Sequence, residues 1–205
     1  MSSPRDAGTI ASAAAAGLVL AAGRSRRMGS AKLVLPWRDG TVVEAVVAAL
    51  RDGGVGRILV VVGADREAIE QALAGSGVEF VENPRYADGD MLGSIQVGLR
   101  AMGDETTAAL LTTGDLPAIQ PATVQALIEA WRASEDALCV PVYHGRRGHP
   151  VLLPRRAWPE VLALASGESL RSYLRLHAAE LRPVEVPDPG IHADIDSPAD
   201  YHGRR

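Results

Sequence analysis

The sequence contains very little cysteine, lysine and asparagine. Its 205 residues include one cysteine, Cys139, one lysine, Lys32, and one asparagine, Asn83, while the other twenty basic residues are arginine. A single thiol excludes an internal disulfide and a zinc-finger framework. Arginine bias explains why lysine is rare, but it does not explain why the one that remains stands at position 32.

Excess basic charge and long hydrophobic runs are also lacking. The net charge is −4 and the isoelectric point about 5.7, whereas nucleic-acid-binding domains usually carry a basic surface. The apolar stretch over residues 10–23 is about 14 residues long, too short to span a bilayer. Its charged flanks, Arg5 and Asp6 before it and Arg24 after it, do not match a signal peptide. We therefore expect a cytoplasmic protein with no nucleic-acid or membrane partner.

The remaining composition fits a folded protein. Hydrophobic residues make up 47% and charged residues 22%, which excludes a disordered or collagen-like chain. The length suits one domain, since domains usually run to about 100–200 residues. We expect residues 1–16, rich in alanine and serine, to be a flexible lead-in, and residues 17–205 to form the domain.

Apolar segments of strand length alternate with segments of helical periodicity. The expected strands cover residues 17–22, 57–63, 78–82 and 108–113, and the expected helices cover residues 42–52, 64–75, 91–102 and 121–133. This alternation predicts an α/β fold with a mostly parallel sheet flanked by helices.

The second half of the chain departs from that rhythm. Strands over residues 137–143 and 149–153, joined by a short polar loop, predict a β-hairpin excursion. Short helices around residues 158–164 and 169–177 and a strand over 181–186 are expected to follow.

The loop after the first expected strand has the composition of a phosphate-binding site. Ligands of open α/β sheets bind beyond the carboxyl ends of the strands, and here the sequence from Leu20 to Lys32 reads LAAGRSRRMGSAK. Gly23 and Gly29 let backbone N–H groups approach an anion, and the basic side chains neutralise phosphate charge. The spacing is neither that of a P-loop nor G-x-G-x-x-G. The alternative is a surface turn with solvated arginines.

Carboxylates follow two other strands. Asp115 follows the strand over residues 108–113, where a carboxylate is a natural ligand for Mg²⁺, which is commonly held by one or two carboxylates plus substrate phosphates. Asp194 and Asp196 share one face of an extended segment, so one of them could supply a second metal oxygen. The alternatives are a turn or cap role for Asp115, and a helix that begins at Ser197-Pro198.

Two further loops are weaker candidates. Asn83 follows the third expected strand, and its amide suits hydrogen bonds to a base edge, although it also reads as a plain turn residue. His149 lies in the hairpin, and no histidine or cysteine stands at a metal-ligand spacing from it.

In this order, the segments resemble the MobA-like nucleotidyltransferases, most closely the molybdenum cofactor cytidylyltransferase branch. The opening motif L-A-A-G-x-S-x-R-M-G-x-x-K fits residue by residue. The other matching motifs are N-P with S-I-x-x-G-L over residues 83–99, G-D-x-P over 114–117, R-G-H-P-V-L over 147–152 and D-I-D-S-P-x-D-Y over 194–201.

The resemblance implies a Rossmann-like nucleotidyltransferase domain over residues 17–205. It also implies a Mg²⁺-dependent transfer of a nucleoside monophosphate onto the terminal phosphate of molybdopterin cofactor, with release of pyrophosphate and delivery of the product to a molybdoenzyme. CTP is favoured as donor because Ala22 stands where guanylyl-transferring relatives read glycine.

Roles for individual residues follow from the same resemblance. Lys32 and Arg27 steady the triphosphate charge, Asp115 and Asp196 hold Mg²⁺ with Asp194 in reserve, and His149 faces the acceptor. The expected nucleotide-binding residues are Leu20, Ala21, Ala22, Gly23, Ser25, Gly29, Asn83, Gly93 and Ser94.

Two alternatives stay open. One is a nucleotidyltransferase for another phosphorylated acceptor, such as a sugar or polyol phosphate. The other is a non-catalytic protein that binds nucleotide or delivers a maturing cofactor, although a pure carrier would not need two metal carboxylates. A nicotinamide oxidoreductase fits poorly, because the glycine spacing of dinucleotide-binding folds is missing.

Overall fold

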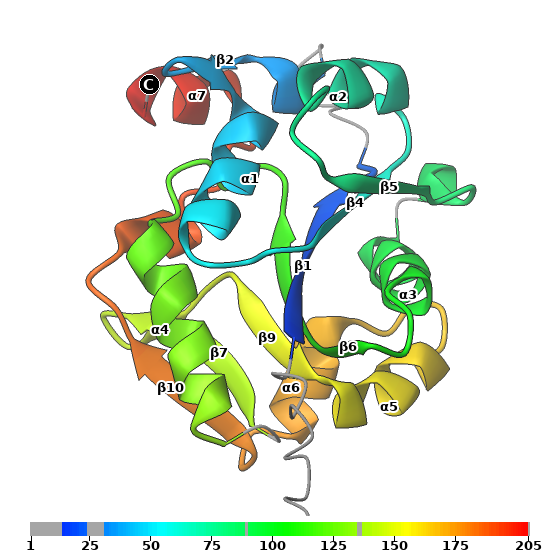
Figure 1. Cartoon of the computed structure of the whole chain (residues 1–205), viewed down its shortest axis with the longest axis vertical. Coiled ribbons are helices and arrows are strands. Elements are labelled where there is room, and N and C mark those ends of the chain that lie inside the picture. Colours follow the sequence, from blue (N-terminus) through cyan, green and yellow to red (C-terminus); the bar gives the residue numbers. More distant parts are fainter. Residues whose placement is uncertain (1–13, 24–30, 89, 135–136, 205) are drawn as a thin grey trace, which may run out of the picture.

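A computed structural model describes residues 14–23, 31–88, 90–134 and 137–204 (Figure 1). One large sheet crosses the molecule in the order β10-β7-β9-β6-β1-β4-β5, with the short β8 paired to β7. Its strands are β1 Ala14–Ala21, β4 Ile58–Val62, β5 Glu79–Glu82, β6 Thr106–Thr113, β7 Leu138–Tyr143, β8 Arg146–Arg147, β9 Val151–Pro154 and β10 Leu181–Glu185. Neighbours pair in parallel except along β9 and β8, which confirms the predicted mostly parallel sheet with a hairpin.

Helices cover both faces of this sheet (Figure 1). One face packs against α1 Val42–Asp52, α2 Arg66–Ala72, α4 Pro121–Arg132 and α7 Pro198–Arg204, and the other against α3 Met91–Ala101, α5 Trp158–Ala163 and α6 Leu170–Leu176. Short 3-10 helices lie at Lys32–Val34, Tyr86–Asp88, Arg155–Ala157 and Pro189–His192.

The strand β1 shows how one apolar run builds two hydrophobic cores. Val19 and Ala21 point into the core under α1 and α4, while Leu18 and Leu20 point into the core under α3, because successive side chains of a strand face opposite ways. A strand buried on both faces must be apolar throughout, which is why the segment reads as a continuous apolar run.

The ends of several elements differ from the sequence expectation. The strand β1 begins at Ala14, which pairs with Thr106, so residues 14–16 belong to the sheet and not to the lead-in; residues 1–13 lie outside the described residues. A two-stranded hairpin, β2 Pro36–Trp37 with β3 Gly40–Thr41, was not expected. The helix α7 begins at Pro198, as the capping alternative for that segment predicted.

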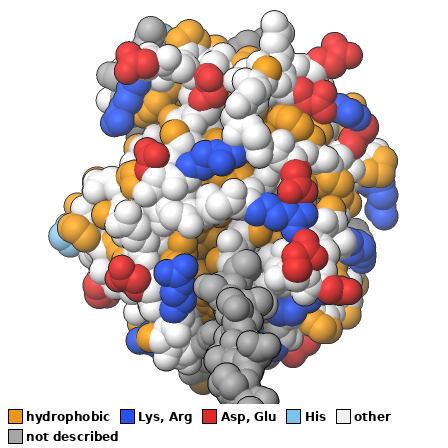
Figure 2. Space-filling view, viewed as in Figure 1, with side chains coloured by type: hydrophobic (Ala, Val, Ile, Leu, Met, Phe, Trp, Pro, Cys, Tyr) orange, Lys and Arg blue, Asp and Glu red, His pale blue; other side chains and the backbone are white. Residues whose placement is uncertain are grey.

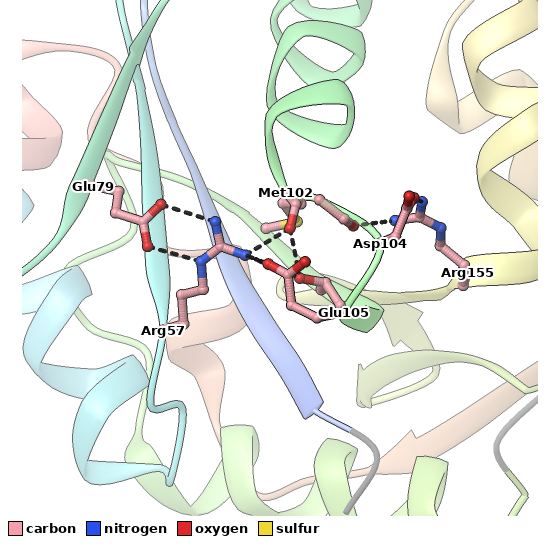
Figure 3. A network of polar contacts seen from close by, with 8 residues as sticks. Arg57, Glu79, Met102, Asp104, Glu105 and Arg155 are labelled. Carbon is pink, nitrogen blue, oxygen red and sulfur yellow. Dashed lines mark hydrogen bonds and ion pairs between the residues drawn. The ribbon is translucent and has the colours of Figure 1, made fainter. Parts of the chain in front are cut away.

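The amino ends of β4, β5 and β6 are joined by one arginine (Figure 3). Arg57, just before β4, donates to both carboxylate oxygens of Glu79 at 2.8 and 2.9 Å. It also donates to the Met102 carbonyl at 2.6 Å and to Glu105 at 2.8 Å. Bidentate arginine–carboxylate pairs are the strong form of this interaction, so Arg57 fixes the starts of β4, β5 and β6 relative to the end of α3.

We expect Arg57→Ala to lower the free energy of unfolding by about 1–2 kcal/mol, because it removes a bidentate pair and a bond to a backbone carbonyl. Arg66→Ala is the matched control: Arg66 also pairs with two carboxylates, Glu70 and Glu82, but its side chain is 48% exposed against 32% for Arg57. Urea denaturation of both variants should show the smaller loss for Arg66→Ala. Equal losses would contradict the structural role of Arg57.

Candidate active site

The topology brings the candidate segments to one edge of the sheet. The parallel strands β1, β4, β5 and β6 all end there, and β9, which is antiparallel to β6, begins there. The loop after β1, Asp115 after β6 and His149 before β9 are therefore neighbours. The chain after β10 returns to the same edge, where the backbone N–H of Ile195 donates to the Asp115 carbonyl at 2.9 Å.

Lys32 lies at the centre of this edge. It opens the 3-10 helix Lys32–Val34, whose buried Leu33 packs into the core. Its ammonium nitrogen lies 2.6 Å from Asp115 Oδ2, 2.9 Å from the Ile195 carbonyl and 3.2 Å from Asp196 Oδ1. Burial lowers the pKa of Lys32, but the pairs with Asp115 and Asp196 outweigh it and raise the pKa. Lys32 is therefore charged at neutral pH.

The segment Asp194-Ile195-Asp196 is fixed by its middle residue. Ile195 is 0% exposed, so its two acidic neighbours are held at the surface on either side. The pKa of Asp194 is raised, first by burial and then by the nearby carboxylates of Asp196 and Asp115. The site therefore carries more negative charge than Lys32 offsets.

The donor set fits a hard divalent cation. Asp115 Oδ1 is buried and has no hydrogen-bond partner, and a buried carboxylate oxygen without a partner is costly. Within the described ranges, no group of three or more histidine, cysteine or acidic side chains could hold a metal by itself. Mg²⁺ needs only one or two carboxylates when substrate phosphates complete its shell, so Asp115 and Asp196 suit this cation.

A cleft of about 520 Å³ adjoins Lys32. Its lining includes Leu20, Ala21, Ala22, Gly23, Lys32, Ser94, Asp115 and Asp196, so the structure brings together most of the residues predicted from the sequence. Gly93 lies in the first turn of α3, beside Ser94, and does not line the cleft. The predicted residues Ser25, Arg27 and Gly29 lie outside the described residues.

Asn83 is placed differently from the expectation. It is only 2% exposed, its amide nitrogen donates to Ser94 Oγ at 2.9 Å, and its amide oxygen accepts from the Arg85 backbone at 2.9 Å. Both ends of the amide are engaged inside the protein. The expected contact between Asn83 and a base is therefore revised: Asn83 orients Ser94 behind the cleft.

A second, larger cleft of about 950 Å³ shares Asp90 and Met91 with the first. His149 lines it, and its Nδ1 lies 3.5 Å from the Leu111 carbonyl. Asp90 caps the start of α3, where its Oδ1 accepts from the Leu92 backbone at 2.9 Å. Sequence reasoning missed Asp90, although an aspartate directly before a helix is a known capping signal.

Sequence reasoning also missed a buried carboxylate behind this edge. Asp188 is 1% exposed and accepts hydrogen bonds from the Gln120 backbone, the Thr123 hydroxyl and the Gly190 backbone. It thereby joins the start of α4 to the 3-10 helix Pro189–His192, whose Ile191 carbonyl accepts from the backbone of His149. The Asp-Pro-Gly sequence signals a turn, but nothing in it signals this long-range role.

The family model of the MobA-like NTP transferase domain matches residues 17–183. The chain belongs to this family. It is a nucleotidyltransferase with the α/β fold that the sequence predicted.

Relatives of this MobA-like NTP transferase carry more than one name. The molybdenum cofactor cytidylyltransferase of Escherichia coli is 29% identical over 90% of this chain and 92% of its own length. The nicotine blue oxidoreductase of Paenarthrobacter nicotinovorans is 27% identical over 88% and 91%.

Among solved structures, Rv0371c of Mycobacterium tuberculosis is 30% identical, with a TM-score of 0.80 over 93% of this chain and 97% of that one. A structure of the same protein in complex with manganese superposes with a TM-score of 0.76, at 29% identity over 93% and 96% of the two chains.

No helix within the described ranges of this MobA-like NTP transferase is long and apolar enough to cross a membrane. Its longest, α4, has 12 residues.

The buried imidazole of His149 makes the stability of this MobA-like NTP transferase depend on pH. Burial lowers the pKa of His149, against smaller opposing effects of the Leu111 carbonyl and of Asp115 and Asp194. The folded protein then binds a proton at His149 less readily than the unfolded chain does. The contribution to stability is fully present above the unfolded pKa of about 6.5 and is lost as pH falls toward the folded pKa.

We expect the free energy of unfolding to fall between pH 7.5 and pH 5.5 in the wild type, and to fall less in His149→Gln, which has no imidazole to protonate. Urea denaturation at the two pH values measures both slopes. His202→Gln is the control, because His202 is exposed on α7. The same slope in wild type and His149→Gln would refute the assignment.

Proposed function

We propose that this protein transfers CMP from CTP to the terminal phosphate of molybdopterin cofactor, with Mg²⁺, and releases pyrophosphate. The observation that carries the proposal is the contact of Lys32 with Asp115 and Asp196 on the wall of the 520 Å³ cleft. The relative named molybdenum cofactor cytidylyltransferase supports the choice of substrates.

The smaller cleft suits the nucleotide triphosphate. Its wall combines the backbone of residues 20–23 with the ammonium of Lys32 and the hydroxyl-bearing Ser94. Among the described residues other than its chain neighbours, none has a heavy atom within 4 Å of where a Cβ of Gly23 would be, which leaves this backbone accessible to a phosphate from that side. These polar groups do not have to move when substrate binds, because the edge of the sheet already holds them in place.

Asp115 and Asp196 are the residues that would hold Mg²⁺. Bound there, the cation supplies charge neutralisation and polarisation of the phosphates. The unpartnered Oδ1 of Asp115 is an oxygen that Lys32 does not already use. The manganese complex of the structural relative Rv0371c supports a divalent cation for this chain.

The reaction needs alignment more than it needs a base. The acceptor phosphate oxygen is already anionic, so the barrier lies in bringing it in line with the α-phosphorus against like charge. Lys32 exchanges its 3.2 Å contact with the half-exposed Asp196 for a phosphate oxygen, and it keeps its 2.6 Å contact with Asp115. Its positive charge then offsets the charge that grows on the leaving pyrophosphate.

The larger cleft suits the acceptor. It opens beside the nucleotide cleft at Asp90 and Met91, and His149, neutral because burial lowers its pKa, lines it as an uncharged hydrogen-bonding group. We propose a molybdoenzyme as the protein that receives the product, and the cytoplasm as its location.

The first test is a pyrophosphate-release assay. Wild-type protein is mixed with each of the four NTPs, Mg²⁺, and either molybdopterin cofactor or a panel of sugar and polyol phosphates. We expect release with CTP and molybdopterin cofactor. Release with another pair would identify a different acceptor or nucleotide, while failure of every pair would favour a non-catalytic carrier.

We expect Asp115→Asn to lower the rate of pyrophosphate release at least about 100-fold, because the amide neither holds Mg²⁺ nor pairs with Lys32. Asp104→Asn is the matched control, since Asp104 pairs with Arg155 at the amino end of β6, away from the clefts (Figure 3). It should keep the wild-type rate. Wild-type turnover in Asp115→Asn would remove this residue from the mechanism.

We expect Lys32→Arg to fold normally but to lose activity about 10-fold or more. A planar guanidinium cannot reproduce the short, converging contacts that the ammonium makes with three oxygens. Thermal melting checks the fold, a CTP titration checks binding, and pyrophosphate release gives the rate. If Lys32→Arg matched the wild type in both affinity and rate, any cation at this position would suffice.

A further inference from the structure

We propose that the larger cleft binds the acceptor through four arginines, and that the acceptor therefore carries a second oxyanion group away from its reacting phosphate. The inference rests on the proposed function, because it places the acceptor in this cleft. The four residues, together called the arginine cluster, are Arg146, Arg147, Arg171 and Arg175.

The arginine cluster comes from two elements far apart in the sequence. Arg146 and Arg147 form β8, in the hairpin that follows β7. Arg171 and Arg175 stand four residues apart on α6, and residues at this spacing lie on the same face of a helix. All four line the wall of one cleft, so the fold gathers their charges from two sides.

These four charges lack the acidic partners that five of the other described arginines have. Arg57, Arg66, Arg85, Arg155 and Arg156 each pair with a carboxylate. Within the described part of the chain, no member of the arginine cluster pairs with one. For comparison, basic and acidic side chains are interspersed on the face of the molecule that Figure 2 draws. In a protein with a net charge of −4, unopposed basic charge at a cleft points to an anionic ligand.

The two acidic residues of the same cleft are engaged with the backbone. Asp90 accepts from the Leu92 N–H at 2.9 Å, and Glu168 accepts from the Ala165 N–H at 2.6 Å. The remaining titratable group, His149, is neutral at pH 7, because burial lowers its pKa. The four arginines outnumber the two carboxylates, so positive charge dominates the wall that an acceptor would meet.

The position of the arginine cluster separates it from the reacting phosphate. None of its members lines the nucleotide cleft, where the acceptor phosphate has to meet the α-phosphorus. They contact a part of the acceptor that stays in the larger cleft. Guanidinium groups bind phosphate and carboxylate oxygens in bidentate geometry. Because the reacting phosphate of the acceptor lies in the nucleotide cleft, the four guanidinium groups of the larger cleft are available for a second oxyanion group of the acceptor.

The test compares two probes that differ by one phosphate. Isothermal titration calorimetry without nucleotide measures the Kd of fructose 6-phosphate and of fructose 1,6-bisphosphate. We expect the wild type to bind the bisphosphate at least about 10-fold more tightly. The double variant Arg171→Gln/Arg175→Gln should lose this preference, while the thermal midpoint stays near that of the wild type.

The matched control removes the same charge elsewhere. Arg100 and Arg132 are exposed near the ends of α3 and α4 and line neither cleft. Arg100→Gln/Arg132→Gln should keep the preference for the bisphosphate. An equal loss in the control, or equal or undetectable binding of both probes by the wild type, would overturn the proposal.

A parallel titration of Mg²⁺ and CTP separates this inference from the proposed function. Normal CTP affinity in Arg171→Gln/Arg175→Gln, together with a lost preference for the bisphosphate, supports both. A wild type that prefers the bisphosphate but does not bind CTP keeps the arginine cluster as an anion site and refutes the proposed cytidylyl transfer.

Discussion

The contact of one ammonium with three oxygens organises the candidate active site of this protein. Lys32 reaches Asp115, which is 83 residues away in the sequence, and Ile195 and Asp196, which are 163 and 164 residues away. Each segment has its own anchor in the core, through Leu33, the end of β6 and Ile195. Because the anchors are rigid, the ammonium and both carboxylates are held in place before any ligand binds, and this preorganisation is what electrostatic catalysis requires.

Charged groups are balanced at the amino end of the sheet but not at its carboxyl end. At the amino end, Arg57 is surrounded by Glu79, Glu105 and the Met102 carbonyl, so its charge is used for stability (Figure 3). At the carboxyl end, Asp115 keeps one oxygen without a partner, and the pKa of Asp194 is raised by burial and by neighbouring carboxylates. An arrangement that costs stability without a ligand is typical of sites that gain it back on binding.

Sequence patterns predicted most of the elements, because the evidence for each of these is local. The helix α1 begins after Thr41, whose side chain and that of Glu44 form a capping box, and β4 is buried at all five positions. For the candidate site, the sequence indicated which segments to consider, because these segments follow strands of a parallel sheet. The pairing of Lys32 with Asp115 was not predicted, because nothing local fixes which side chains meet across 83 residues. For the same reason, the sequence did not predict the hydrogen bond of Asn83 to Ser94, the three hydrogen bonds that Asp188 accepts, or the convergence of α6 and β8 on one cleft.

The choice of lysine at position 32 follows from the shape of its head group. An ammonium is compact and has three donors, and it lies within 3.2 Å of three acceptors that belong to two side chains and one carbonyl. A guanidinium is planar and donates in a fixed fork, which suits two oxygens of one carboxylate, as Arg57 shows with Glu79. In the same way, the planar guanidinium of Arg57 spreads its donors over separate positions, to Glu79, to Glu105 and to the Met102 carbonyl. Lysine stays where oxygens from separate segments converge on one point, and this explains why a chain with twenty arginines has its single lysine there.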